Sequence, residues 1–311
     1  MVHLKNYTRI IGIFIFIYIL SRLEWQEMLI LLGKVKILYF WVSIFLIIPI
    51  VFLRTLKWRL LINSLEITVP FRPLTEMMMK GLFLGFFTPG KVGEFYRAKY
   101  LSKLSNTTLA TTLFTVIFDR VIDFLIFGVI ALIGGIIFAG LFKTPLVLIV
   151  FSFLLVILIF SLLIKKEYLQ KILRFLIRYF LPKTVRNKTN SFVENFFNQI
   201  KKMNKMLMMK LFFVESLYYL TLVIIHYFLS LSLRLYIPFW YLFIIIALVT
   251  LLVILPFSFS GLGTREAGYI FFLSFLGISP TQAVSFSLLI FVWNILLTIP
   301  GGALLLKNKN L

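Results

Sequence analysis

Long apolar runs, separated by short polar links, extend over nearly the whole sequence. A helix that crosses a bilayer needs about 20 mostly apolar residues. The pattern therefore predicts an all-α fold, a polytopic transmembrane helix bundle of about 7–8 spans, in which residues 1–311 form a single transmembrane domain. The clearest predicted spans cover residues 10–20, 38–53, 109–142, 145–164, 211–233, 240–255 and 283–306. Pro300, Gly301 and Gly302 are expected to break the last of them.

Two further apolar runs, residues 77–87 and 267–276, are only about half as long as a spanning helix. Each adjoins a stretch rich in glycine, proline and charge, FTPGKVGEFYR at residues 87–97 and PFSFSGLGTREAG at residues 256–268. We therefore expect two short re-entrant or broken helices. If both are re-entrant, the C-terminus lies outside. If one of them crosses the membrane, the C-terminus lies inside, which the lysines near it favour.

The composition agrees with a membrane protein, because 61% of the residues are hydrophobic and only 14% are charged. The formal net charge of +21 does not indicate nucleic-acid binding, since no nucleic-acid-binding motif accompanies it. Residues 165–210 hold 12 Lys or Arg and 2 Glu, a net charge of +10. This segment is predicted to be a basic cytoplasmic loop with an amphipathic helix on the inner leaflet.

The residue types present exclude several kinds of site. The chain contains no cysteine, which excludes disulfides and thiolate metal sites, and its two histidines are far apart, so no metal site and no cofactor are predicted. GFFTPGK at residues 85–91 matches the start of a P-loop, but Val92 replaces the Ser or Thr that would bind magnesium. No nucleophile elbow, HExxH or DxD motif occurs, which weakens the case for an enzyme without excluding one.

Cations follow the second predicted span at once, as Arg54, Lys57 and Arg59 around Trp58. This pattern predicts an interfacial anchor at the cytoplasmic end of the helix. The alternative is that Arg54 or Arg59 contacts a lipid phosphate.

Irregular backbone survives at membrane depth only inside protein or beside water, so both glycine-rich motifs are expected to line a cavity. Glycines before short helices would leave N–H groups free for a phosphate, and nearby cations would add charge. Carboxylates would balance these cations or carry protons; alternatively, the charges pair only to hold helices together, as in a Glu94–Arg97 pair. The candidate lipid- or phosphate-binding residues are Pro89, Gly90, Lys91, Gly93, Glu94, Arg97, Gly261, Gly263, Arg265 and Glu266.

A third polar group, Asp119, Arg120 and Asp123, lies inside the apolar run 109–142. On a helix, Asp119 and Asp123 share one face, and Arg120 can pair with Asp123. Charged groups within a membrane face the interior of the bundle rather than lipid. We therefore expect these residues to form the polar lining of the cavity between the two motifs.

Three motifs together, TPGKVGEFYR, FDRVIDF and SGLGTREAG, resemble the transmembrane, flippase-like family of lysylphosphatidylglycerol synthases. The resemblance covers nearly the whole chain. It implies a multi-pass protein of the cell membrane that moves an anionic or polyprenyl-phosphate-linked lipid between leaflets and binds anionic head groups. Two-domain members carry a soluble domain that aminoacylates lipid; this chain ends at Leu311, so that activity is not expected. The alternative is a membrane enzyme, or an accessory subunit for lipid or glycolipid modification that works with a separate glycosyltransferase.

Overall fold

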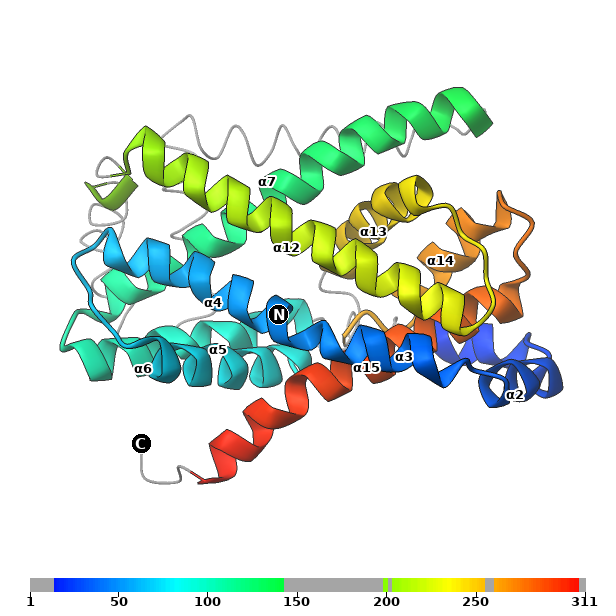
Figure 1. Ribbon diagram of the computed structural model, residues 1–311, viewed down its shortest axis with the longest axis horizontal. Coiled ribbons are helices and arrows are strands. Elements are labelled where there is room, and N and C mark those ends of the chain that lie inside the picture. The colour runs from blue at the N-terminus through cyan, green and yellow to red at the C-terminus, as the bar shows by residue number, and fades with distance from the viewer. Residues whose placement is uncertain (1–13, 143–197, 201–202, 255–259, 308–311) are drawn as a thin grey trace, which may run out of the picture.

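The computed structural model describes residues 14–142, 198–200, 203–254 and 260–307, and within these ranges the regular structure is helical (Figure 1). The predicted all-α fold is therefore confirmed. The helices are α2 (Trp25–Gly33), α3 (Ile37–Phe45), α4 (Ile47–Asn63), α5 (Phe71–Phe86), the 3₁₀ helix η1 (Pro89–Phe95), α6 (Tyr96–Ser105), α7 (Leu109–Phe142), α12 (Lys205–Ser232), α13 (Phe239–Ile254), α14 (Thr264–Ser274) and α15 (Pro280–Lys307).

Four helical stretches in the described part of the chain are long and apolar enough to cross a membrane. They correspond to the predicted spans at 38–53, 109–142, 211–233 and 283–306. The predicted span at 240–255 forms α13, whose 16 residues extend about 24 Å, less than the thickness of the hydrocarbon core. Residues 14–21 are helical, whereas the predicted span 145–164 and most of the basic loop 165–210 lie outside the described residues. The four stretches are Ile37–Asn63, Leu109–Phe138, Lys205–Ser232 and Pro280–Lys307.

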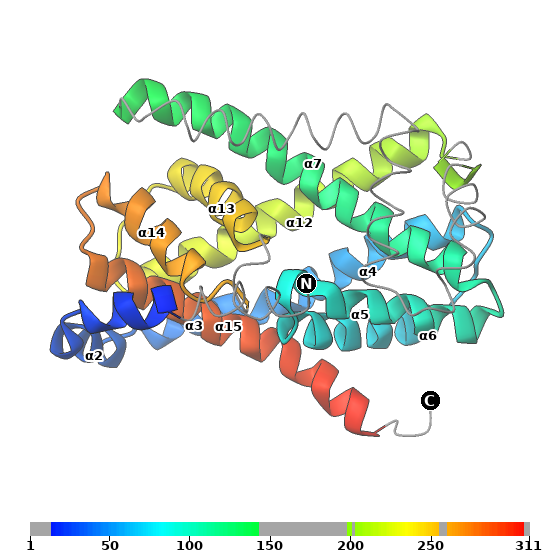
Figure 2. The same ribbon diagram turned by 180° about the vertical axis from the view of Figure 1, so that it is seen from behind.

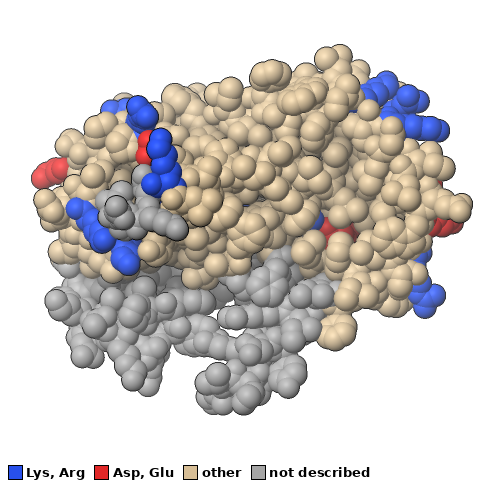
Figure 3. All heavy atoms as spheres, turned by 90° about the horizontal axis from the view of Figure 1, so that it is seen from below, with Lys and Arg blue, Asp and Glu red and all other residues tan. Residues whose placement is uncertain are grey.

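The surface has the character expected of a membrane protein. In the space-filling view, most of the visible Lys and Arg side chains gather near the two ends of the long axis, and a broad surface without them lies between (Figure 3). Large apolar side chains are exposed in the described part of the chain; Ile48 and Phe213, for example, are 70% and 65% exposed. A bilayer around the middle of the molecule would cover them, with the long axis close to the membrane normal.

The first glycine-rich motif forms the turn of a helical hairpin. Helix α5 runs from one end of the molecule toward the middle, η1 reverses the chain, and α6 returns beside α5 (Figures 1 and 2). Gly93 makes the turn possible, because a Cβ atom there would lie 2.2 Å from the carbonyl oxygen of Leu84. The expected short helix before this motif is confirmed, although α5 begins at Phe71 rather than at residue 77. Near the start of α5, Arg72 and Glu76 form an i,i+4 ion pair on the surface of the helix.

The described part of the second motif, residues 260–268, lies where α14 begins in a second hairpin. Helix α13 enters from the opposite end of the molecule, and α14 packs against it on the way back (Figures 1 and 2). Two glycines with left-handed φ angles, Gly261 at +78° and Gly263 at +83°, precede α14. The turns of the two hairpins meet, since the hydroxyl of Ser260 donates a hydrogen bond to the carbonyl oxygen of Phe86. Helices α5 and α13 therefore enter from opposite ends of the molecule, and the turns that follow them are joined near the middle.

Helix α15 lies against the first hairpin. The predicted break at Pro300 is wrong, because α15 continues through it to Lys307. The glycines serve close packing instead: a Cβ at Gly301 would lie 2.0 Å from the carbonyl oxygen of Met79 on α5. The end of α15 and the start of α12 lie toward the same end of the molecule (Figures 1 and 2).

Candidate functional site

Eight charged side chains from five helices converge in the interior, and none of them is more than 17% exposed. Four are cations and four are carboxylates, so their formal charges cancel. Charges buried within a membrane require such pairing, because water cannot solvate them there. We call this set the charge cluster. Its members are Arg54 and Lys57 on α4, Glu94 on η1, Arg97 on α6, Asp119, Arg120 and Asp123 on α7, and Glu215 on α12.

Lys57 occupies the centre of the charge cluster. Its Nζ lies 2.9 Å from Asp119 Oδ1 and 2.6 Å from Glu215 Oε2, and it also donates to Asp123 Oδ1. The predicted shared face of Asp119 and Asp123 is confirmed by these contacts. The prediction of an interfacial anchor is wrong for Lys57, which is 2% exposed, because its partners lie on α7 and α12 rather than in water.

Arg97 connects α6 to α4 and α7 within the cluster. Arg97 donates to Asp119 Oδ2, and its guanidinium lies 4.8 Å from the ring centroid of Trp58. The indole of Trp58 donates to Thr115 at 3.0 Å and is fully buried, so it too is a core residue and not an interfacial one. The contacts of Arg97 and Trp58 with each other and with α7 therefore hold α4, α6 and α7 together.

The remaining pairs differ in part from expectation. Arg120 pairs with Asp123 at 2.9 Å, as predicted. The expected Glu94–Arg97 pair is wrong: Glu94 Oε2 instead lies 3.4 Å from Arg120 and 3.8 Å from Arg54. Arg97 points toward α7, where it makes the shorter contact to Asp119.

The turn of the first hairpin presents one cation outward. Lys91 is exposed and has a left-handed backbone conformation, with φ of 55°. Pro89, Gly90 and Gly93 lie in η1, so these glycines are part of a 3₁₀ helix and do not precede an α-helix directly, as was expected. The first regular helix after them begins at Tyr96. Lys91 is therefore the motif's accessible charge, whereas Glu94 and Arg97 are buried.

The second motif satisfies its own charges. Glu266 Oε2 accepts a hydrogen bond from the N–H of Gly263 at 2.6 Å, and Oε1 accepts from Arg265 at 2.6 Å. Arg265 also donates to Ser287 on α15 at 2.7 Å. The expected placement of Gly261 and Gly263 before a short helix is confirmed, as is the balancing of Arg265 by Glu266. A phosphate would have to displace this carboxylate to reach the start of α14.

Aromatic rings, rather than the α7 carboxylates, connect the two motifs. The ring of Phe291 on α15 lies 5.5 Å from that of Phe86 and 5.2 Å from the guanidinium of Arg265, measured to its centroid. Asp119, Arg120 and Asp123 belong to the charge cluster beside the first motif, and among the described residues no ion pair joins that cluster to Arg265 or Glu266. These three residues therefore lie beside the first motif, and their role as a lining between the two motifs stays a prediction.

Three members of the charge cluster, Arg54, Lys57 and Glu215, are absent from the sequence-based set of site residues. Glu215 carried a usable signal, because it is an acidic residue inside the apolar run 211–233. Arg54 and Lys57 carried an ambiguous one, because cations at the end of an apolar run also mark an interface.

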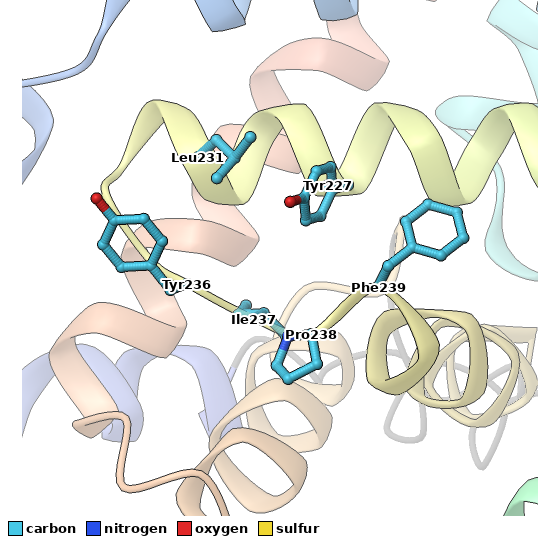
Figure 4. Close-up of a pocket in the computed structure, with 6 residues that line it drawn as sticks. All are labelled: Tyr227, Leu231, Tyr236, Ile237, Pro238 and Phe239. Carbon is cyan, nitrogen blue, oxygen red and sulfur yellow. The ribbon is translucent and has the colours of Figure 1, made fainter.

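A pocket of about 190 Å³ lies at the end of α12, away from both motifs (Figure 4). Apolar and aromatic side chains line it, including Tyr227, Tyr236 and Phe239. Rings of this kind are typical of the interface between membrane and water. We therefore assign this pocket to the membrane boundary and not to the site.

In a comparison with protein families, residues 9–301 match the family model described as lysylphosphatidylglycerol synthase TM region. The matched range includes both glycine-rich motifs and all eight residues of the charge cluster. Comparisons with curated proteins and with solved structures gave no match.

Proposed function

The chain belongs to the lysylphosphatidylglycerol synthase TM family, and on this premise we propose that it is a lipid flippase-like transporter. Its substrate would be an anionic or polyprenyl-phosphate-linked lipid, whose head group passes through the protein while the tail stays in the bilayer. We place the protein in the cell membrane, with the basic segment 165–210 on the cytoplasmic side. The end of α15 would then also face the cytoplasm.

One observation carries the proposal: two interrupted hairpins enter from opposite ends and meet near the middle of the molecule. In transporters, discontinuous helices of this kind place helix ends and irregular backbone at the midplane, where the substrate binds. Neighbouring protein can satisfy such backbone inside a bilayer. The junction at Ser260 and Phe86 is thus the point at which a head group crossing the membrane would pass.

The charges near the junction suit a phosphate. Lys91 is exposed on the first turn, and Arg265 lies beside the start of α14 on the second. Without a substrate, Glu266 occupies both Arg265 and the N–H of Gly263. An incoming phosphate would replace Glu266 on these two donors, since it offers the same kind of acceptor. The exchange of one anion for another makes binding reversible, which transport requires.

The test is a measurement of lipid translocation by purified protein in liposomes. A fluorescent phosphatidylglycerol is placed in the outer leaflet, and an impermeant reductant reports how much of it reaches the inner leaflet. We expect the double variant Glu94→Gln, Arg265→Ala to lose translocation by about 10- to 100-fold, because charge-assisted hydrogen bonds contribute about 1.5–3 kcal/mol. Because Glu94 is buried, Lys91→Gln is measured as well; this exposed residue can be changed without disturbing the core, and we expect it to slow translocation too.

The matched control is Glu76→Gln with Arg72→Ala, the same two replacements at an exposed ion pair on α5. This control is expected to translocate lipid at the rate of the unchanged protein. Translocation at that rate by both site variants would refute the site. Chemical modification of the lipid by the purified protein, detected by mass spectrometry, would instead favour a membrane enzyme.

A further inference from the structure

Glu215 has the fewest ion-pair partners among the four carboxylates of the charge cluster. Its side chain is 1% exposed, and its Oε2 accepts a hydrogen bond from Lys57 at 2.6 Å. Its other oxygen, Oε1, is buried and has no hydrogen-bond partner. A buried acceptor without a partner destabilises the folded protein, and more so when the group is charged.

The other three carboxylates each pair with two or three cations, and Glu94 pairs with Arg54 and Arg120, although Glu94 Oε2 and Asp119 Oδ1 are likewise buried without a hydrogen-bond partner. Asp119 pairs with Lys57, Arg97 and Arg120, and Asp123 pairs with Lys57 and Arg120. Glu215, by contrast, pairs with Lys57 alone, which it shares with both aspartates. If one carboxyl in the cluster carries a proton, it is therefore Glu215, because protonation removes the charge that has the fewest ion-pair partners.

Among the described residues, the cation that forms an ion pair with Glu215 is Lys57. Of the helices that contact α12, α4 and α7 bring charges near Glu215, whereas in the described ranges no ion pair or hydrogen bond reaches it from α3, α13 or α15. The charged and titratable groups that face it are Arg54 and Lys57 on α4, Asp119, Arg120 and Asp123 on α7, and Tyr218 on α12.

We infer that Glu215 is a proton-binding residue whose protonation and the binding of an anionic head group favour each other, so that lipid transport is coupled to a proton. A proton from water on one side forms an O–H bond with Glu215 Oε1, and it returns to water when the carboxyl ionises again. This inference rests on the proposed function, for which it supplies an energy source.

The sign of the coupling follows from the charges. With Glu215 ionised, the four cations and four carboxylates of the cluster cancel. With Glu215 protonated, the cluster has a net charge of +1, which attracts a phosphate entering nearby. By linkage, the phosphate raises the affinity for the proton by the same factor, typically about 5- to 150-fold. Proton and head group therefore move together, and the pair carries less net charge through the membrane than the head group alone.

The first measurement compares translocation in liposomes with and without an imposed pH gradient, using the fluorescent phosphatidylglycerol described above. For the unchanged protein, we expect a gradient of about one pH unit to change the rate several-fold, up to about tenfold, in line with the coupling above. For Glu215→Gln, which keeps the size of the side chain but binds no proton, the ratio of the two rates should fall to one. Glu76→Gln, at the exposed pair, should keep the ratio of the unchanged protein.

The second measurement does not depend on transport. Infrared difference spectra of the detergent-solubilised protein, recorded between acidic and alkaline pH, report the carbonyl stretch of protonated carboxyl groups. We expect a band that is absent from Glu215→Gln and that changes when short-chain phosphatidylglycerol is added. If this band is present but neither the unchanged protein nor any variant translocates lipid, the proton site is upheld and the transport function is refuted. Identical spectra from both proteins, or gradient-dependent translocation by Glu215→Gln, would overturn the inference.

Discussion

Removal of Lys57 should destabilise the protein strongly, because its ammonium serves three buried carboxylates. In Lys57→Met, Asp119 keeps its two arginines and Asp123 keeps Arg120, but Glu215 loses its only partner. Breaking a buried pair in this way costs about 3–5 kcal/mol. For a chain of this size, that loss lowers the melting temperature by on the order of 10 °C.

Unfolding can be followed by tryptophan fluorescence in detergent, since Trp58 is fully buried beside Arg97. The double variant Lys57→Met, Glu215→Gln removes both members of the pair, so it should melt above the single Lys57→Met variant, with a coupling of about 1–3 kcal/mol. Lys34→Met, at an exposed position, should melt like the unchanged protein. A Lys57→Met protein as stable as the unchanged one, or a double variant less stable than the single one, would refute the cluster as described.

Two further predictions concern the hairpin turns. Gly93→Ala should destabilise the protein by about 1–3 kcal/mol, because the new methyl group meets the backbone of Leu84, whereas Gly33→Ala, where a Cβ meets nothing within 4 Å, should not; thermal unfolding compares the two. Ser260→Ala should lose about 1 kcal/mol with the hydrogen bond to Phe86, and Ser274→Ala, whose exposed hydroxyl bonds only within its own helix, should lose almost nothing. If each variant melts at the temperature of its control, the hairpin turns and their junction are not packed as described.

Local sequence patterns predicted those structural features that depend on residues close together in the sequence. The spacing of Asp119 and Asp123 placed both on one helix face, and the pairing of Arg120 with Asp123 follows from the same geometry. The two motifs were recognisable as interruptions because Gly93, Gly261 and Gly263 permit backbone that other residues cannot adopt. These features need no information from distant parts of the chain.

The partners of Lys57 could not be predicted in this way. In sequence, Asp123 lies 66 residues from it and Glu215 lies 158 residues from it. Hydropathy alone does not distinguish a charge that is paired inside the bundle from one that is hydrated at the interface, so Lys57 and Trp58 were placed in the wrong environment. For the same reason, the pairing of Glu94 with Arg120, instead of Arg97, follows only from how η1 and α6 pack against α7.

The most direct test of the central claim is a structure of the protein in lipid nanodiscs that contain phosphatidylglycerol. The account predicts a lipid phosphate where the two hairpin turns meet, within hydrogen-bonding distance of Lys91 or Arg265, with Glu266 withdrawn from Arg265. A head group bound instead in the aromatic pocket at the end of α12, with the Arg265–Glu266 pair intact, would contradict it.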